Sequence, residues 1–121
     1  MQHASKAYAL IAKETASPRE LEATLLLRAA AKLQAVHDQW DGKSDNLDEA
    51  VLYNRRLWTV FIDSVLHDGS SLPFETRQNL ANLGVFVMGE TFSLMTNPLP
   101  KNLVSLININ RELAAGLRGN A

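Results

Sequence analysis

The sequence predicts an all-α protein: a compact single domain over residues 1–121, built as a mainly antiparallel bundle of about five helices. Apolar residues recur every three or four positions along most of the chain, and no stretch alternates apolar and polar residues as a half-buried strand would. Proline and glycine divide the chain into helix-sized pieces. With 121 residues, 46% of them apolar and 21% charged, the chain can bury one hydrophobic core.

The first two helices lie in the N-terminal third of the chain. A short amphipathic helix is expected over residues 5–15. The second has the strongest start signal, because Ser17 can accept bonds from free amides, Pro18 suits the first helical position and Glu20 completes a capping box. We expect this helix to end shortly before Gly42, since glycine commonly follows a helix end.

Three longer helices follow, giving one short and four longer helices in total. The third is expected from about residue 46 to residue 67, with acidic residues suited to the positive end of its dipole. The fourth is expected from Pro73 to residue 96, because a second proline follows two residues later. The fifth is expected to begin at Pro100 and to fray over residues 116–121.

Two Asn-Arg pairs lie within the apolar stripes of the third and fifth helices. At about 100° per residue, Asn54 and Asn110 fall on the same side as their apolar neighbours, so we expect both to be buried and hydrogen-bonded. A structural role in fixing how the helices meet is a simpler interpretation than a binding site. Arg55 and Arg111 are expected at the stripe edges, and either could pair with Glu90 of the fourth helix.

The fourth helix carries two apolar stripes on different sides. One stripe contains Leu80, Phe86, Val87 and Leu94, and the other contains Ala81, Val85, Met88, Phe92 and Met95. Either the other helices surround this helix, or part of the second stripe lines a groove for a partner helix. On the third helix, Leu52 and Val60 flank Arg56 in a small mixed patch, although single exposed apolar residues are also normal on a protein surface. The candidate partner-binding residues are therefore Val85, Met88, Phe92, Met95, Leu52 and Arg56.

Composition argues against several classes of function. The chain has no cysteine, which excludes thiolate chemistry. Its net charge of −1 argues against nucleic acid as a direct partner. His37 with Asp41 and His67 with Asp63 have a spacing used by metal ligands, but two residues do not make a site. No catalytic or phosphate-binding motif occurs. We expect a cytoplasmic protein that is not an enzyme, binds no cofactor or metal, and does not enter a membrane.

An ordered set of short segments resembles the FlaF family, the flagellar biosynthesis regulators of alphaproteobacteria. The resemblance extends over nearly the whole chain, and its segments are Tyr8, Ser17 to Glu22, Tyr53 to Trp58, Leu72-Pro73, Arg77, Leu83, Ile107 to Arg111 and Gly116-Leu117. No single motif is decisive, but the ordered set is fairly specific.

The resemblance implies a small cytoplasmic protein needed for flagellin production and export. It implies that the protein binds flagellin as a secretion chaperone, alongside the flagellin translation repressor FlbT. The terminal segments of unpolymerised flagellin, which form amphipathic helices in the filament, are the implied partner. The alternative is a post-transcriptional regulator of flagellin messenger RNA, acting directly or through FlbT. The resemblance brings no catalytic or cofactor residues with it.

Overall fold

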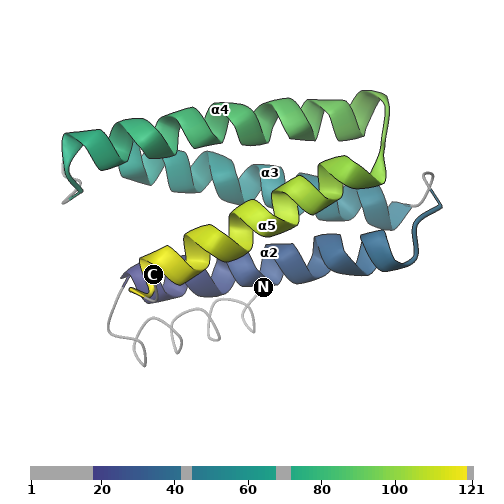
Figure 1. Cartoon of the computed structure of the whole chain (residues 1–121), viewed down its shortest axis with the longest axis horizontal. Helices are drawn as coiled ribbons and strands as arrows, with labels where there is room; N and C mark the ends of the chain where they lie inside the picture. Colours follow the sequence, from purple (N-terminus) through teal and green to yellow (C-terminus); the bar gives the residue numbers. More distant parts are fainter. Residues whose placement is uncertain (1–17, 42–44, 68–71, 120–121) are drawn as a thin grey trace, which may run out of the picture.

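The computed structural model describes residues 18–41, 45–67 and 72–119, and these residues form four α-helices joined by short connections (Figure 1). The helices are α2 (Pro18–Asp38), α3 (Asp45–Leu66), α4 (Phe74–Thr96) and α5 (Pro100–Leu117). The all-helical prediction is confirmed for this part of the chain, and the bounds agree with the expected ones within about two residues. The short helix expected over residues 5–15 and the proposed cap Ser17 lie outside the described residues.

Local sequence explains the sharp connection between α4 and α5. The amide of Asn97 donates to the carbonyl of Ser93 at 2.8 Å, which closes the last turn of α4. Pro98 follows, and a proline cannot continue the helix because it has no amide to donate. Leu99 is extended, as the residue before a proline prefers, and Pro100 occupies the first turn of α5. The connection therefore reverses the chain within a few residues.

The helices follow one another around the bundle in the order α2, α3, α4, α5. Neighbours in this order pack against each other, and α5 closes the ring by packing closely along α2. The diagonal pairs are therefore α2 with α4 and α3 with α5. Figure 1 shows that α5 lies near α4 at their shared connection and diverges from it toward its C-terminal end. In the described part of the chain α4 contacts α3 and α5 only. It is therefore a helix at the edge of the bundle and is not surrounded by the others.

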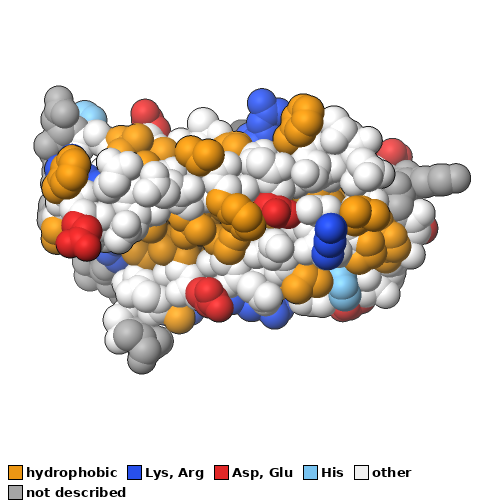
Figure 2. Space-filling model, turned by 45° about the horizontal axis from the view of Figure 1, so that its top comes forward, with side chains coloured by type: hydrophobic (Ala, Val, Ile, Leu, Met, Phe, Trp, Pro, Cys, Tyr) orange, Lys and Arg blue, Asp and Glu red, His pale blue; other side chains and the backbone are white. Residues whose placement is uncertain are grey.

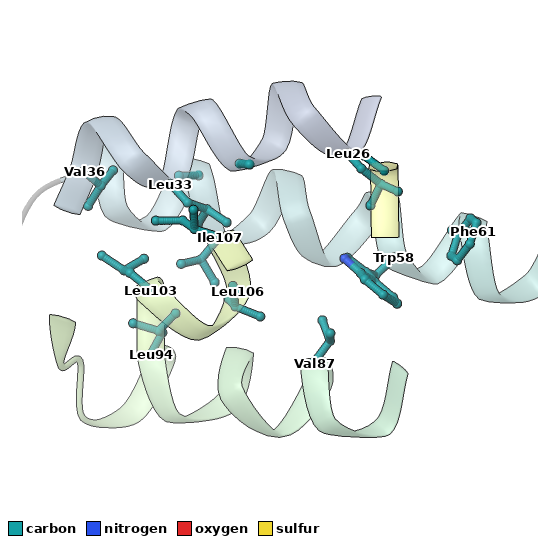
Figure 3. Packing of buried hydrophobic residues seen from close by; sticks show 14 of the residues in the cluster. Leu26, Leu33, Val36, Trp58, Phe61, Val87, Leu94, Leu103, Leu106 and Ile107 are labelled. Carbon is teal, nitrogen blue, oxygen red and sulfur yellow. The ribbon is translucent and has the colours of Figure 1, made fainter. Parts of the chain in front are cut away.

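All four helices contribute to the hydrophobic core. Figure 3 shows side chains of α2 and α5 meeting at the centre, with Trp58 entering from α3 and Val87 and Leu94 entering from α4. The largest fully buried side chains are those of Trp58, Leu26, Leu33, Leu103, Leu106, Val65, Val87, Asn54 and Asn110. The two asparagines in this set confirm the prediction that both side chains face the core.

One residue of the stripe expected to be buried on α4 is not in the core. Leu80, Val87 and Leu94 are buried, but 49% of Phe86 is exposed. Phe86 lies one helical turn before Glu90, on the side of α4 that faces α5. Because α5 diverges from α4 toward this end of the bundle, it does not cover the ring. Gly84 and Thr91 complete the buried side of α4 instead.

Candidate functional site

Three side chains and one backbone carbonyl form a polar cluster inside the bundle. The indole Nε1 of Trp58 donates to Oδ1 of Asn110 at 2.9 Å. The Nδ2 of Asn110 donates to Oδ1 of Asn54 at 2.7 Å and to the carbonyl oxygen of Leu26 at 3.3 Å. Asn110 uses both ends of its amide, as a buried asparagine must if its polar atoms are to be satisfied. The polar cluster therefore joins α2, α3 and α5 at one level of the core.

The two arginines that follow these asparagines are not part of the polar cluster and lie at the exposed edges of their stripes, as expected. Arg55 and Arg111 are exposed, and Arg111 donates from Nη2 to Oε1 of Gln34 on α2 at 3.3 Å. The expected pairing of Glu90 with one of these arginines is wrong, because Oε2 of Glu90 accepts a bond of 2.6 Å from Nδ2 of Asn102. Glu90 lies on the α5 side of α4, near the short connection, where Asn102 in the first turn of α5 is close.

A groove runs along the outer surface between α3 and α4. Its larger hollow has a volume of about 720 Å³ and is lined by Thr59, Val60, Ile62, Asp63 and Leu66 of α3 and by Ala81, Gly84, Val85 and Met88 of α4. A smaller hollow of about 200 Å³ is lined by Asp48, Val51, Leu52 and Arg55 of α3 and by Leu94 and Met95 of α4. Since α3 and α4 are antiparallel, the two hollows follow one another along the same pair of helices. We call the two hollows together the α3–α4 groove.

The floor of the larger hollow depends on a glycine. A Cβ atom built on Gly84 would lie 3.0 Å from both Cγ1 and Cδ1 of Ile62, closer than most side-chain contacts allow. The absence of a side chain at position 84 therefore lets α4 approach α3 closely at this point. Ile62 and Gly84 together give the hollow a shallow apolar floor. Gly89, five residues further along α4, has no such neighbour.

The candidate partner-binding residues mostly lie along the α3–α4 groove. Val85 is 74% exposed, Phe92 66% and Met95 58%, while Met88 is half-buried. Val85 and Met88 line the larger hollow and Met95 lines the smaller one. Phe92 lies between them on the same helical stripe. The second stripe of α4 is therefore largely open, with Met88 partly packed against the core.

The two candidates on α3 are placed differently from each other. Leu52 is 41% exposed and lines the smaller hollow, opposite Met95. Arg56 is exposed but does not line either hollow of the α3–α4 groove. Val60 of the same patch lines the larger hollow, but sequence reasoning missed most of the α3 wall, including Ile62 and Leu66. Positions 48, 52, 55, 59, 62 and 66 recur every three or four residues, and this spacing is the signal that could have identified them.

Figure 2 shows a second apolar area on the face that carries α4 and α5. A band of apolar side chains runs along the middle of this view, and further apolar side chains lie along its upper edge. Half-buried Leu83 and half-exposed Phe86 of α4 lie on the α5 side of that helix, and Ile109 and Leu113 of α5 are half-buried. None of these residues lines the α3–α4 groove.

The described residues contain no group of three or more His, Asp or Glu side chains that could hold a metal ion. Nδ1 of His37 lies 3.6 Å from Oδ1 of Asp38, at the end of α2. Within the described ranges, no helix is long and apolar enough to cross a membrane.

Comparison with known proteins identifies the family. The family model described as flagellar protein FlaF matches residues 4–117, which is nearly the whole chain. The chain belongs to the FlaF family. No curated protein and no solved structure matches it significantly. The FlaF match includes all four described helices, the polar cluster and both walls of the α3–α4 groove, so the resemblance inferred from the sequence segments is confirmed and the chain is a flagellar protein.

Proposed function

We propose that this FlaF-family protein binds flagellin in the cytoplasm as a secretion chaperone and so supports flagellin synthesis and export. The observation that carries the proposal is the α3–α4 groove, an open surface that exposes large apolar side chains on a bundle that already buries a core among its four helices. Large apolar side chains gathered on a surface commonly mark an interaction site. Family membership directs the choice of partner toward the flagellum.

The α3–α4 groove has the form of a receptor for one helix. Its α4 wall follows the second stripe from Ala81 to Met95, which at 1.5 Å per residue is about 21 Å, or roughly four helical turns. An amphipathic helix placed between two others buries its apolar face at positions spaced three and four residues apart. Met88 and Met95 suit such a groove, because the unbranched methionine side chain adapts to partners of different shape.

The flagellin termini have the matching chemistry. They form amphipathic helices in the filament, and before assembly their apolar faces lack the neighbours that would cover them. Binding in the α3–α4 groove would cover one such face and prevent it from associating with other unfolded segments. The groove can do this without a cofactor, because burial of apolar surface supplies the affinity.

The test is calorimetric titration of the protein with flagellin monomer and with its isolated terminal segments. Val85→Glu and Phe92→Glu should each weaken binding by at least about tenfold, since a carboxylate would be carried into an apolar contact. The matched control is Val104→Glu, which changes another exposed valine, 40% exposed, on α5 and outside the α3–α4 groove. Circular dichroism should show the same helix content for all three variants.

Absence of binding to flagellin and to both terminal segments would reject the chaperone proposal. Equal weakening by Val104→Glu would reject the α3–α4 groove as the site. The alternative function, regulation of flagellin messenger RNA, predicts a strongly salt-dependent shift of leader RNA by the protein. A net charge of −1 does not favour that outcome. Binding of FlbT by the wild-type protein, with no binding of flagellin, would favour regulation through the repressor.

A further inference from the structure

The two walls of the α3–α4 groove differ in charge. Asp48, Arg55 and Asp63 all line its hollows from the α3 side, and all three are exposed. They are separated by seven and eight residues, which is about 10 and 12 Å along the helix. None of the three forms an ion pair within the described part of the chain. The α3 wall therefore presents charges in the order negative, positive, negative.

The α4 wall has no corresponding charges. Between residues 78 and 96 the only charged side chain in the sequence is Glu90. Glu90 lies on the opposite side of α4, where it accepts the bond from Asn102 of α5. The groove side of α4 consists of apolar side chains, Ala81, Val85, Met88, Phe92 and Met95, interrupted by small or uncharged polar ones. A charged residue placed against this wall would lose water without gaining a partner.

We propose that the α3–α4 groove selects its helix by charge order, and this inference rests on the proposed function. The preferred occupant is an amphipathic helix with an apolar stripe, an uncharged edge toward α4, and an edge toward α3 that carries basic, acidic and basic residues in that order. The basic residues pair with Asp48 and Asp63, and the acidic residue pairs with Arg55. Such charge pairs contribute modestly to affinity but fix register and reject wrong partners.

The two hollows add a second requirement. Val85 of the larger hollow and Met95 of the smaller one are ten residues apart, which is about 15 Å along α4. A bound helix therefore places two large apolar side chains about ten or eleven residues apart, one in each hollow. Together with the charge order, this spacing defines a single register. A helix shifted by one turn would move its two large apolar side chains out of the hollows. It would also move its charged side chains away from Asp48, Arg55 and Asp63.

The probes are three synthetic helical peptides of 18 residues, by design identical in their apolar positions. The first carries Lys, Glu and Lys at edge positions separated by seven and eight residues. The second carries the same residues in the order Glu, Lys, Lys, so that composition and net charge are unchanged. The third carries Glu, Lys and Glu. In low salt the first should bind the full-length protein about five- to tenfold more tightly than the third, with the second between them.

Two further measurements keep the result specific to the α3–α4 groove. In about 1 M salt, where the Debye length is about 3 Å, the three affinities should converge while binding itself persists. The double variant R55E/D63K should prefer the third peptide over the first. Both substituted side chains are exposed, so circular dichroism should show an unchanged helix content.

Equal affinities for the three peptides in low salt, or a preference that the double variant does not reverse, would overturn the inference. So would failure of all three peptides to bind while flagellin binds, and that result would leave the proposed function intact. Discrimination of the peptides as expected, with no binding of flagellin, would reject the proposed function and keep the charge-ordered groove.

Discussion

The two long edges of the bundle are built in different ways. Along the edge between α2 and α5, polar side chains join the helices: Nε of Arg118 lies 2.8 Å from Oε1 of Glu20, and Arg111 donates to Gln34. Along the edge between α3 and α4, the described residues form no side-chain hydrogen bond between the helices, and the surface is hollowed and apolar. The first edge is held by polar contacts between its helices, whereas the second has an apolar α4 wall and leaves the charged residues of its α3 wall unpaired in the described part of the chain.

This difference shows why an apolar stripe cannot be interpreted from one helix alone. Val85 and Val87 lie two residues apart on α4, yet Val85 is 74% exposed and Val87 is fully buried. The side chains are identical, so only the positions of α3 and α5 decide their roles. A helix at the edge of a bundle needs one apolar stripe for the core, and a second stripe is available for a partner.

The largest expected effect on stability concerns the polar cluster, which joins α2, α3 and α5 inside the bundle. Asn110→Ala should lower the free energy of unfolding by about 3 kcal/mol, because it leaves the indole N–H of Trp58 and Oδ1 of Asn54 buried without partners. Asn54→Ala should cost only about 1 kcal/mol, since Asn110 keeps its bonds to Trp58 and Leu26. Urea unfolding of both variants measures the difference. Equal costs would show that Asn110 is not the centre of the cluster.

A smaller effect tests the close approach of α3 and α4. Gly84→Ala should destabilise the protein by about 1 kcal/mol, because the new Cβ would press against Ile62 and overcome the gain in helix propensity. Gly89→Ala is the matched control in the same helix, and it should stabilise by roughly 0.5–1 kcal/mol, since its Cβ would meet nothing within 4 Å. Thermal unfolding of the two variants measures whether each substitution stabilises or destabilises the protein. Stabilisation by Gly84→Ala would show that Ile62 can move aside.

The smallest effect concerns the polar edge. Arg118→Ala removes the bonds to Glu20 and to Oγ1 of Thr24, and it should cost no more than about 0.5 kcal/mol in low salt. The cost should fall further in 1 M salt, where an exposed ion pair is screened. Arg56→Ala is the control, because Arg56 is exposed and no side-chain bond of it is seen in the described part of the chain. A loss above about 1.5 kcal/mol for Arg118→Ala would show that this edge stabilises the bundle strongly.

Sequence reasoning succeeded where the phase of a single helix decides the outcome. Asn54 and Asn110 each lie within one clear apolar stripe, so their burial followed from the 100° step alone. It failed where the answer depends on how two helices cross. Phe86 was expected in the core, but α5 diverges from α4 and leaves half of the ring exposed. The partner of Glu90 likewise depends on the short connection that brings Asn102 beside it.

The α3–α4 groove was half predictable. Its α4 wall appeared in the sequence as a second stripe from Ala81 to Met95, but nothing in one helix shows whether such a stripe faces a neighbour or solvent. Its α3 wall was mostly missed, because Thr59 and Asp63 look like ordinary surface residues until α4 is placed beside them, and Arg55 was a candidate partner of Glu90. Gly84 gave no clear signal, since its importance lies in the distance to Ile62.

The polar cluster should also affect how readily each helix opens away from the bundle. It joins α2, α3 and α5 and leaves out α4, which the described residues tie to α5 through the bond between Glu90 and Asn102. Parts of a protein open with different free energies, and those with fewer ties open first. Amide hydrogens of α4 should therefore exchange with solvent faster than those at the centre of α2 and α5. We therefore expect the helix that forms one wall of the groove to separate from the bundle at the least cost in free energy.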